Sequence, residues 1–147
     1  MSFHSSLIAS AVWPADLVTA GVVTSAAQVY TGRRPQDKPN RLGEVWLERL
    51  ADPPAEGWGF QHVDRHAYLV HVRYPLGNQG GDQTGKAQLD VIEARMQTIR
   101  DRYDTAVPFS STFTGMLPCE ATEEGVDTDP EADVIDGTVR VTFSVKE

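Results

Sequence analysis

The segment Lys86–Tyr103, KAQLDVIEARMQTIRDRY, has the apolar pattern of a helix that buries one side. Its apolar residues recur at alternating intervals of three and four, and they are Leu89, Ile92, Met96, Ile99 and Tyr103. A helix with one apolar stripe depends on a partner surface for its stability. Strand-like runs lie before and after the segment. The sequence therefore predicts a long helix, about 86–103, that covers one face of a mainly antiparallel sheet.

Four runs have the composition or the alternation of β-strands, and they are Val29–Thr31, Gly43–Leu50, Arg65–Pro75 and Gly137–Glu147. The last run alternates most regularly. Its predicted inward residues are Val139, Val141, Phe143 and Val145. Phe113–Glu124 is predicted to be an edge strand, because Pro118 cannot donate a hydrogen bond within a central ladder.

A short N-terminal helix is expected through Leu7, Ile8, Ala11 and Val12, and Pro14 should end or kink it. The predicted order of helix, three strands, helix and two strands is that of an α+β domain. The chain has 147 residues, 40% of them hydrophobic, which suits a single domain 1–147 with its own core. No apolar run approaches the roughly 20 residues of a membrane-spanning helix, so no membrane association is expected.

The formal net charge of −8 is concentrated near the C-terminus. Residues 120–147 carry nine acidic and two basic residues, a net charge of −7. Glu120–Asp136 is therefore predicted to be an exposed acidic loop that either keeps the protein in solution or orients a partner. Such charge repels phosphate backbones and disfavours sequence-independent binding of nucleic acid. The most basic segment lies earlier, at Arg33–Arg41.

The glycine-rich segment before the predicted helix has the outline of a phosphate-binding loop. Gly80 precedes Gly85-Lys86 at a suitable spacing, but Ala87 occupies the position where such loops carry a metal-binding Ser or Thr. A parallel nucleotide-binding sheet also needs more crossover units than this chain has. No nucleotide site is predicted, and Asp82 or Thr84 is expected to cap the helix.

Two sets of residues have spacings that metal ligands use. His62, Asp64 and His66 would share one face of a strand, yet no other cluster supplies an obvious fourth ligand. The acids from Asp127 to Asp133 alternate like a calcium loop, but Ala132 stands where that loop requires glycine. The sequence predicts no metal ligand, no cofactor and no catalytic residue. The chain is expected not to be an enzyme.

The layout of the whole chain resembles the tail terminator, or tail completion, proteins of long-tailed bacteriophages. The matching segments are SLIASAV, EVWLERL, AYLVHVRYP, LDVIEARMQTIRDRY and GTVRVTFSVKE. The resemblance rests on the length of the chain, the order of its elements and the general pattern of apolar and polar residues. It implies a homo-oligomeric ring, a hexamer, that caps the tail tube and joins the tail to the head connector. DNA would pass through the ring without specific binding, and the protein, made in the host cytoplasm, would lie at the tail–neck junction of the virion.

Three segments are the expected surfaces for building or docking such a ring: the basic segment, the glycine-rich loop Gly77–Gly85 and the acidic loop. The residues assigned to partner contacts are Arg33, Arg34, Lys38, Arg41, Asp82, Lys86, Glu123, Glu124, Asp127, Asp129 and Glu131. Two other interpretations remain open after the ring protein. The second is a cytosolic α+β protein-binding module or assembly factor, and the third is a small metal-dependent enzyme that uses His62–His66.

Overall fold

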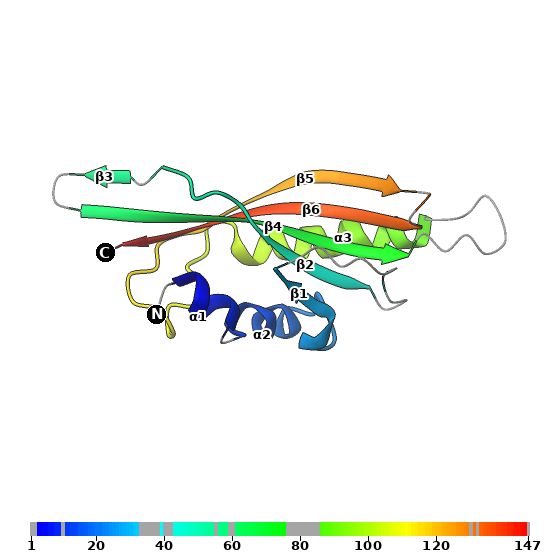
Figure 1. Ribbon diagram of the computed structural model, residues 1–147, viewed down its shortest axis with the longest axis horizontal. Helices are drawn as coiled ribbons and strands as arrows, with labels where there is room; N and C mark the ends of the chain where they lie inside the picture. Colours follow the sequence, from blue (N-terminus) through cyan, green and yellow to red (C-terminus); the bar gives the residue numbers. More distant parts are fainter. Residues whose placement is uncertain are drawn as a thin grey trace.

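The computed structural model describes residues 3–9, 11–32, 39, 43–54, 56–58, 61–75, 86–129, 131 and 133–146. The helices are α1 (Phe3–Ala9), α2 (Val12–Thr19), the short 3-10 helix η1 (Ala26–Gln28) and α3 (Lys86–Tyr103). The strands are β1 (Val29–Thr31), β2 (Glu44–Arg49), β3 (Glu56–Trp58), β4 (Gln61–Pro75), β5 (Glu120–Asp129) and β6 (Val134–Lys146). Figure 1 shows the long strands side by side, with α3 running along them and α1 and α2 beneath. The α+β class is confirmed.

The strands form one sheet in the order β1-β2-β4-β6-β5, and β3 pairs with the first residues of β4. β4 and β6 are the central pair, in register from Val63 opposite Lys146 to Pro75 opposite Val134. Every pairing is antiparallel except that of β1 with β2, so the sheet is mixed. β4 begins four residues before the predicted run, because its first residues pair with β3 and with the end of β6.

The inward face of the sheet follows the alternation of the sequence. On β4 the fully buried residues include Tyr68 and Val70, and on β6 they are Val139, Val141 and Phe143, as predicted. Helix α3 packs against β4, β5 and β6 on this face. A Cβ atom on Gly137 would lie 2.3 Å from Ile92 Cγ2 and 2.6 Å from Met96 Sδ. Glycine is therefore required where β6 meets the apolar stripe of α3.

A second set of contacts joins α2 to the C-terminal end of α3. The Trp13 indole donates to the Tyr103 hydroxyl at 3.1 Å, and that hydroxyl donates to Asp16 Oδ2 at 2.6 Å. Arg102 Nε donates to the same carboxylate at 2.7 Å. Burial raises the pKa of Asp16, but the hydrogen bonds from Arg102 and Tyr103 outweigh it and lower the pKa below its usual value. The carboxylate is thus held ionised between the two helices.

The N-terminal prediction needs a correction. One helix ended or kinked at Pro14 was expected, but the break lies at Ala11, which has φ 56° and separates α1 from α2. Pro14 is the third residue of α2, and the first turn of a helix tolerates proline because its N–H groups have no partners within the helix. No helix among the described residues is long and apolar enough to cross a membrane.

One prediction about the C-terminal third is right only in part, and another is wrong. The expected edge strand Phe113–Glu124 begins only at Glu120, and before it only Met116 forms an isolated bridge, with Val145. The expected acidic loop Glu120–Asp136 is largely strand, since β5 covers Glu120–Asp129 and β6 starts at Val134. The backbone of β5 pairs with β6, and most of its side chains face solvent, so it needs no apolar alternation.

The packing of α3 gives a stability prediction. Ile92→Asp would place a carboxylate in the buried contact with Gly137, so we expect a loss of more than about 4 kcal/mol in the free energy of unfolding. Val91→Asp is the matched control, because Val91 is the neighbouring residue and 37% exposed. Urea unfolding of both variants checks this. Equal losses would contradict the assigned orientation of α3.

Candidate functional site

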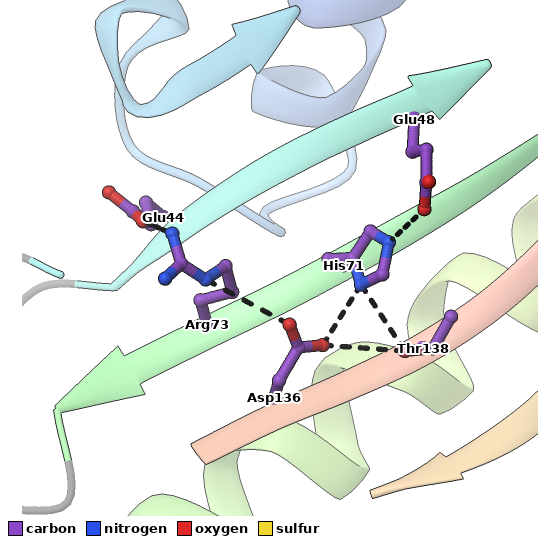
Figure 2. A network of polar contacts seen from close by, with 6 residues as sticks. All are labelled: Glu44, Glu48, His71, Arg73, Asp136 and Thr138. Carbon is purple, nitrogen blue, oxygen red and sulfur yellow. Dashed lines mark hydrogen bonds and ion pairs between the residues drawn. The ribbon is translucent and has the colours of Figure 1, made fainter. Parts of the chain in front are cut away.

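The outward face of the sheet carries a network of polar side chains from three neighbouring strands. Arg73 on β4 lies opposite Glu44 on β2 and Asp136 on β6. His71 lies opposite Trp46 on β2 and Thr138 on β6. Glu48 is two residues beyond Trp46, on the same face of β2. Figure 2 shows that these side chains point toward one another across the three strands. We call Glu44, Glu48, His71, Arg73, Asp136 and Thr138 the outer-face network.

Arg73 is the most buried charge of the network. Its side chain is 3% exposed, and that of Glu44, to which Arg73 Nη1 donates, is 5% exposed. Arg73 Nε lies 3.8 Å from Asp136 Oδ2. Two charges removed from water in this way are tolerated only as partners, because each alone would lose its hydration without compensation. The pair therefore ties β2 and β4 in one register.

His71 is held between two carboxylates. Its Nε2 lies 2.8 Å from Glu48 Oε1, and its Nδ1 lies 3.2 Å from Asp136 Oδ1. The ring stacks on the indole of Trp46, with centroids 4.4 Å apart. Burial lowers the pKa of His71, but the hydrogen bonds with Asp136 and Glu48 outweigh it and raise the pKa above its usual value of 6.5. The charged imidazolium can donate to both carboxylates at once.

The network is a set of ion pairs and hydrogen bonds that engage one another. Both nitrogens of His71 already have carboxylate partners, which leaves neither as a free base for a substrate. The Thr138 hydroxyl donates to Asp136 at 3.3 Å. The one thiol, Cys119, lies elsewhere, and burial raises its pKa to about 12, so it remains a thiol. The described residues of the network include no activated nucleophile.

The histidines of the predicted metal set lie apart from this network. His62 Nε2 is 2.9 Å from Asp64 Oδ1 on an exposed part of β4. His66 instead lies 3.5 Å from Asp52 and packs against the ring of Phe3. Among the residues that the structure describes, no three His, Cys, Asp or Glu side chains are grouped so that they could hold a metal ion. The structure gives the metal interpretation no site in this part of the chain.

The predicted partner residues fall into two groups. Arg33, Arg34, Lys38, Arg41 and Asp82 lie outside the described residues, as does Thr84, and Lys86 is described only as the first residue of α3. The structure brings the acidic residues together instead. Glu123, Glu124, Asp127 and Asp129 lie on the edge strand β5, and Glu131 lies in the turn between β5 and β6.

Two hollows flank β5 where its pairing with β6 shifts register between Glu123 and Gly125. The outer hollow, on the network's face, has a volume of about 460 Å³ and is lined by Leu69, His71, Thr138, Arg140 and residues 124–127. The inner hollow, of about 430 Å³, is lined by Glu93, Met96 and Gln97 of α3 and by residues 123–126. Gly125, with φ 136°, is shared by both, so the β-bulge opens the edge of the sheet on its two faces.

The outer-face network was not predicted, although part of its signal is present in the sequence. Alternation places Glu44, Trp46 and Glu48 on one face of β2, and Leu69, His71 and Arg73 on one face of β4. The register between the strands decides that Glu44 meets Arg73. Register is set by contacts that are distant in sequence, so alternation alone left the partners unassigned.

The buried pair gives a second stability prediction. Arg73→Met would remove the buried guanidinium that faces the Glu44 carboxylate, and we expect a loss of about 3–5 kcal/mol in the free energy of unfolding. Glu44→Gln combined with Arg73→Met should recover part of that loss. Arg140→Met is the control, because both side chains of the Arg140–Glu124 pair are exposed, at 50% and 44%. Chemical denaturation measures all three, and equal losses for the two arginines would contradict this assignment.

His71 gives a prediction about pH. Because folding raises its pKa, the stability that it contributes is fully present below the unfolded value of 6.5 and is lost as the pH rises through the higher folded value. The free energy of unfolding of the wild type, relative to His71→Gln, should therefore fall as the pH is raised from about 5.5 to about 8.5. His62→Gln is the control and should retain the fall, since His62 is not in the network. If the free energy of unfolding had the same pH dependence in the wild type and in His71→Gln, the pH effect would belong to another group.

The chain matches no known protein-family model, and no curated protein sequence matches it.

Proposed function

We propose that this protein is a structural subunit of a ring at the tail–neck junction of a tailed bacteriophage or related particle. The ring would terminate the tail tube and join it to the head connector, as the resemblance to tail terminator proteins implies. The observation that carries the proposal is that the described sheet has two unlike edges, the three-residue β1 and the ten-residue acidic β5. A ring of identical subunits needs two different surfaces on each subunit, and two unlike edges supply them.

The arrangement of the helices supports this proposal. We infer that α3, together with α1 and α2, covers one face of the sheet as a whole. Ile92 and Met96 meet Gly137 there, and Trp13 packs edge-on against Tyr68 and Phe143 of the same face. The outward face and the two edges would then remain for neighbouring subunits, the tail tube protein and the connector.

The charge of the chain also suits a ring through which DNA slides. The net charge is −8, and β5 alone carries Glu120, Glu123, Glu124, Asp127 and Asp129. A surface of this sign makes no phosphate contacts and releases no counterions, so DNA would pass without being held. The engaged nitrogens of His71 and the thiol form of Cys119 favour a structural role over the metal-dependent enzyme.

The size of the purified protein tests the proposal. We expect multi-angle light scattering after gel filtration to give a ring-sized mass, a hexamer, or a mass that rises toward it with concentration. Electron microscopy of the same fractions should show closed rings, and these should sediment with tail tubes from the particle whose genome encodes the chain. A protein that stays monomeric at every concentration and does not bind tail tubes would contradict the ring and favour a cytosolic binding module.

A further inference from the structure

The acidic edge strand β5 has the features of a docking surface for a second copy of this chain. We propose that the bulged part of β5 binds the Arg33-Arg34 pair of a neighbouring copy, an inference that rests on the proposed ring. The site consists of the two hollows that share Glu124, Gly125 and Val126. The occupant is the basic segment that follows β1 in the other copy.

The first argument is the exposed edge itself. β5 is ten residues long and, within the described part of the chain, pairs only with β6. A strand edge of this length presents a row of N–H and C=O groups to any extended segment that approaches it. Edge strands in proteins are commonly kept short for this reason, and a long one is suited to adding another strand.

The second argument is the charge around the two hollows. Glu93, Glu123 and Glu124 line the inner hollow, whose floor includes the buried Met96. Glu124 and Asp127 line the outer hollow, together with Arg140. The ion pairs that two of these glutamates already make are exposed to solvent, with Glu123 3.6 Å from Arg100 and Glu124 3.2 Å from Arg140. Such pairs are weak, so the carboxylates can accept a second guanidinium.

The third argument is the spacing of the occupant. Side chains of an added strand alternate between the two faces of the sheet, so consecutive arginines point to opposite faces. Arg33 and Arg34 are consecutive, and the two hollows lie on opposite faces of β5. Each guanidinium would meet carboxylates of β5 in its own hollow, Glu123 and Glu124 in the inner one and Glu124 and Asp127 in the outer one. Lysines or isolated arginines would not match both hollows at once.

The fourth argument shows whether the arginine pair that binds β5 comes from the same chain or from a neighbouring copy. Gly32 directly follows β1, and two residues of extended chain beyond it span at most about 7 Å. β5 lies four strand spacings away, about 19 Å, at the opposite edge. The backbone of Arg33-Arg34 therefore cannot pair with its own β5. The contact must join unlike edges of two copies, which closes a ring or extends a filament.

Charge reversal on each side tests the contact. We expect Arg33→Glu/Arg34→Glu to weaken self-association at least about tenfold, and Glu124→Lys/Asp127→Lys to do the same, because each places like charges opposite one another. A chain that carries both pairs of substitutions restores opposite charges across every contact. It should regain most of the wild-type assembly in analytical ultracentrifugation.

Matched controls separate the contact from general charge. Asp90→Lys/Asp101→Lys makes the same change in net charge on exposed positions of α3, and Arg49→Glu/Lys146→Glu makes the matching change on exposed positions outside the basic segment. Both controls should assemble more tightly than the test variants. Thermal unfolding of every variant shows that each one folds.

The outcomes distinguish this inference from the proposed ring. Two results would overturn the β5 contact but not the ring. In the first, neither pair of charge reversals weakens the assembly. In the second, the chain that carries both pairs of substitutions does not regain assembly. The acidic residues of β5 would then only protect its edge from aggregation. A wild-type chain that never associates would overturn both the contact and the ring.

Discussion

The fold depends on the close approach of α3 to β6 at Gly137. Only a residue without a side chain admits Ile92 and Met96 there, so the helix and the central strands are fixed in one relative position. Because side chains alternate along a strand, turning Val72 and Val139 toward the helix turns Arg73 and Thr138 away from it. The location of the outer-face network is thus a consequence of apolar packing on the other side of the sheet.

The charged groups on the two faces of the sheet join different elements. On the helix side, Asp16 accepts from Arg102 and Tyr103 and joins the N-terminal helices to the end of α3. On the outward side, the Glu44–Arg73 pair and His71 join three strands. Net gains from buried ion pairs are small, but their geometry is demanding, so both clusters act mainly by excluding other arrangements of the same elements. Association through the outward face or the edges requires such a rigid sheet.

Much of the fold could be predicted from periodicity, because helix α3 and strands β2, β4 and β6 each have an apolar stripe or an alternation that matches one buried face. β5 could not, since most of its side chains face solvent and its apolar side chains are only Ala121 and Val126, a composition that looks like an acidic loop. Ala11 could not either, because alanine seldom adopts a positive φ. For the candidate site, alternation in the sequence assigns the polar residues of β2 and β4 to one face of each strand. Which residue pairs with which depends on the register between the strands, and the sequence pattern does not give that register. The acidic residues of the predicted interface were found together, and the strand that unites them was missed.

The central pairing of the sheet also shapes how the chain reaches its folded state. β4 and β6 join positions between 59 and 83 residues apart, from Pro75 with Val134 to Val63 with Lys146. Loop closure over such distances is slow compared with the formation of a helix such as α3, which needs only local contacts. β4 is synthesised before β6, so its residues lack that partner strand until β6 has been made. The β5 edge of the sheet is therefore completed late in folding, because β5 pairs with β6 among the described residues.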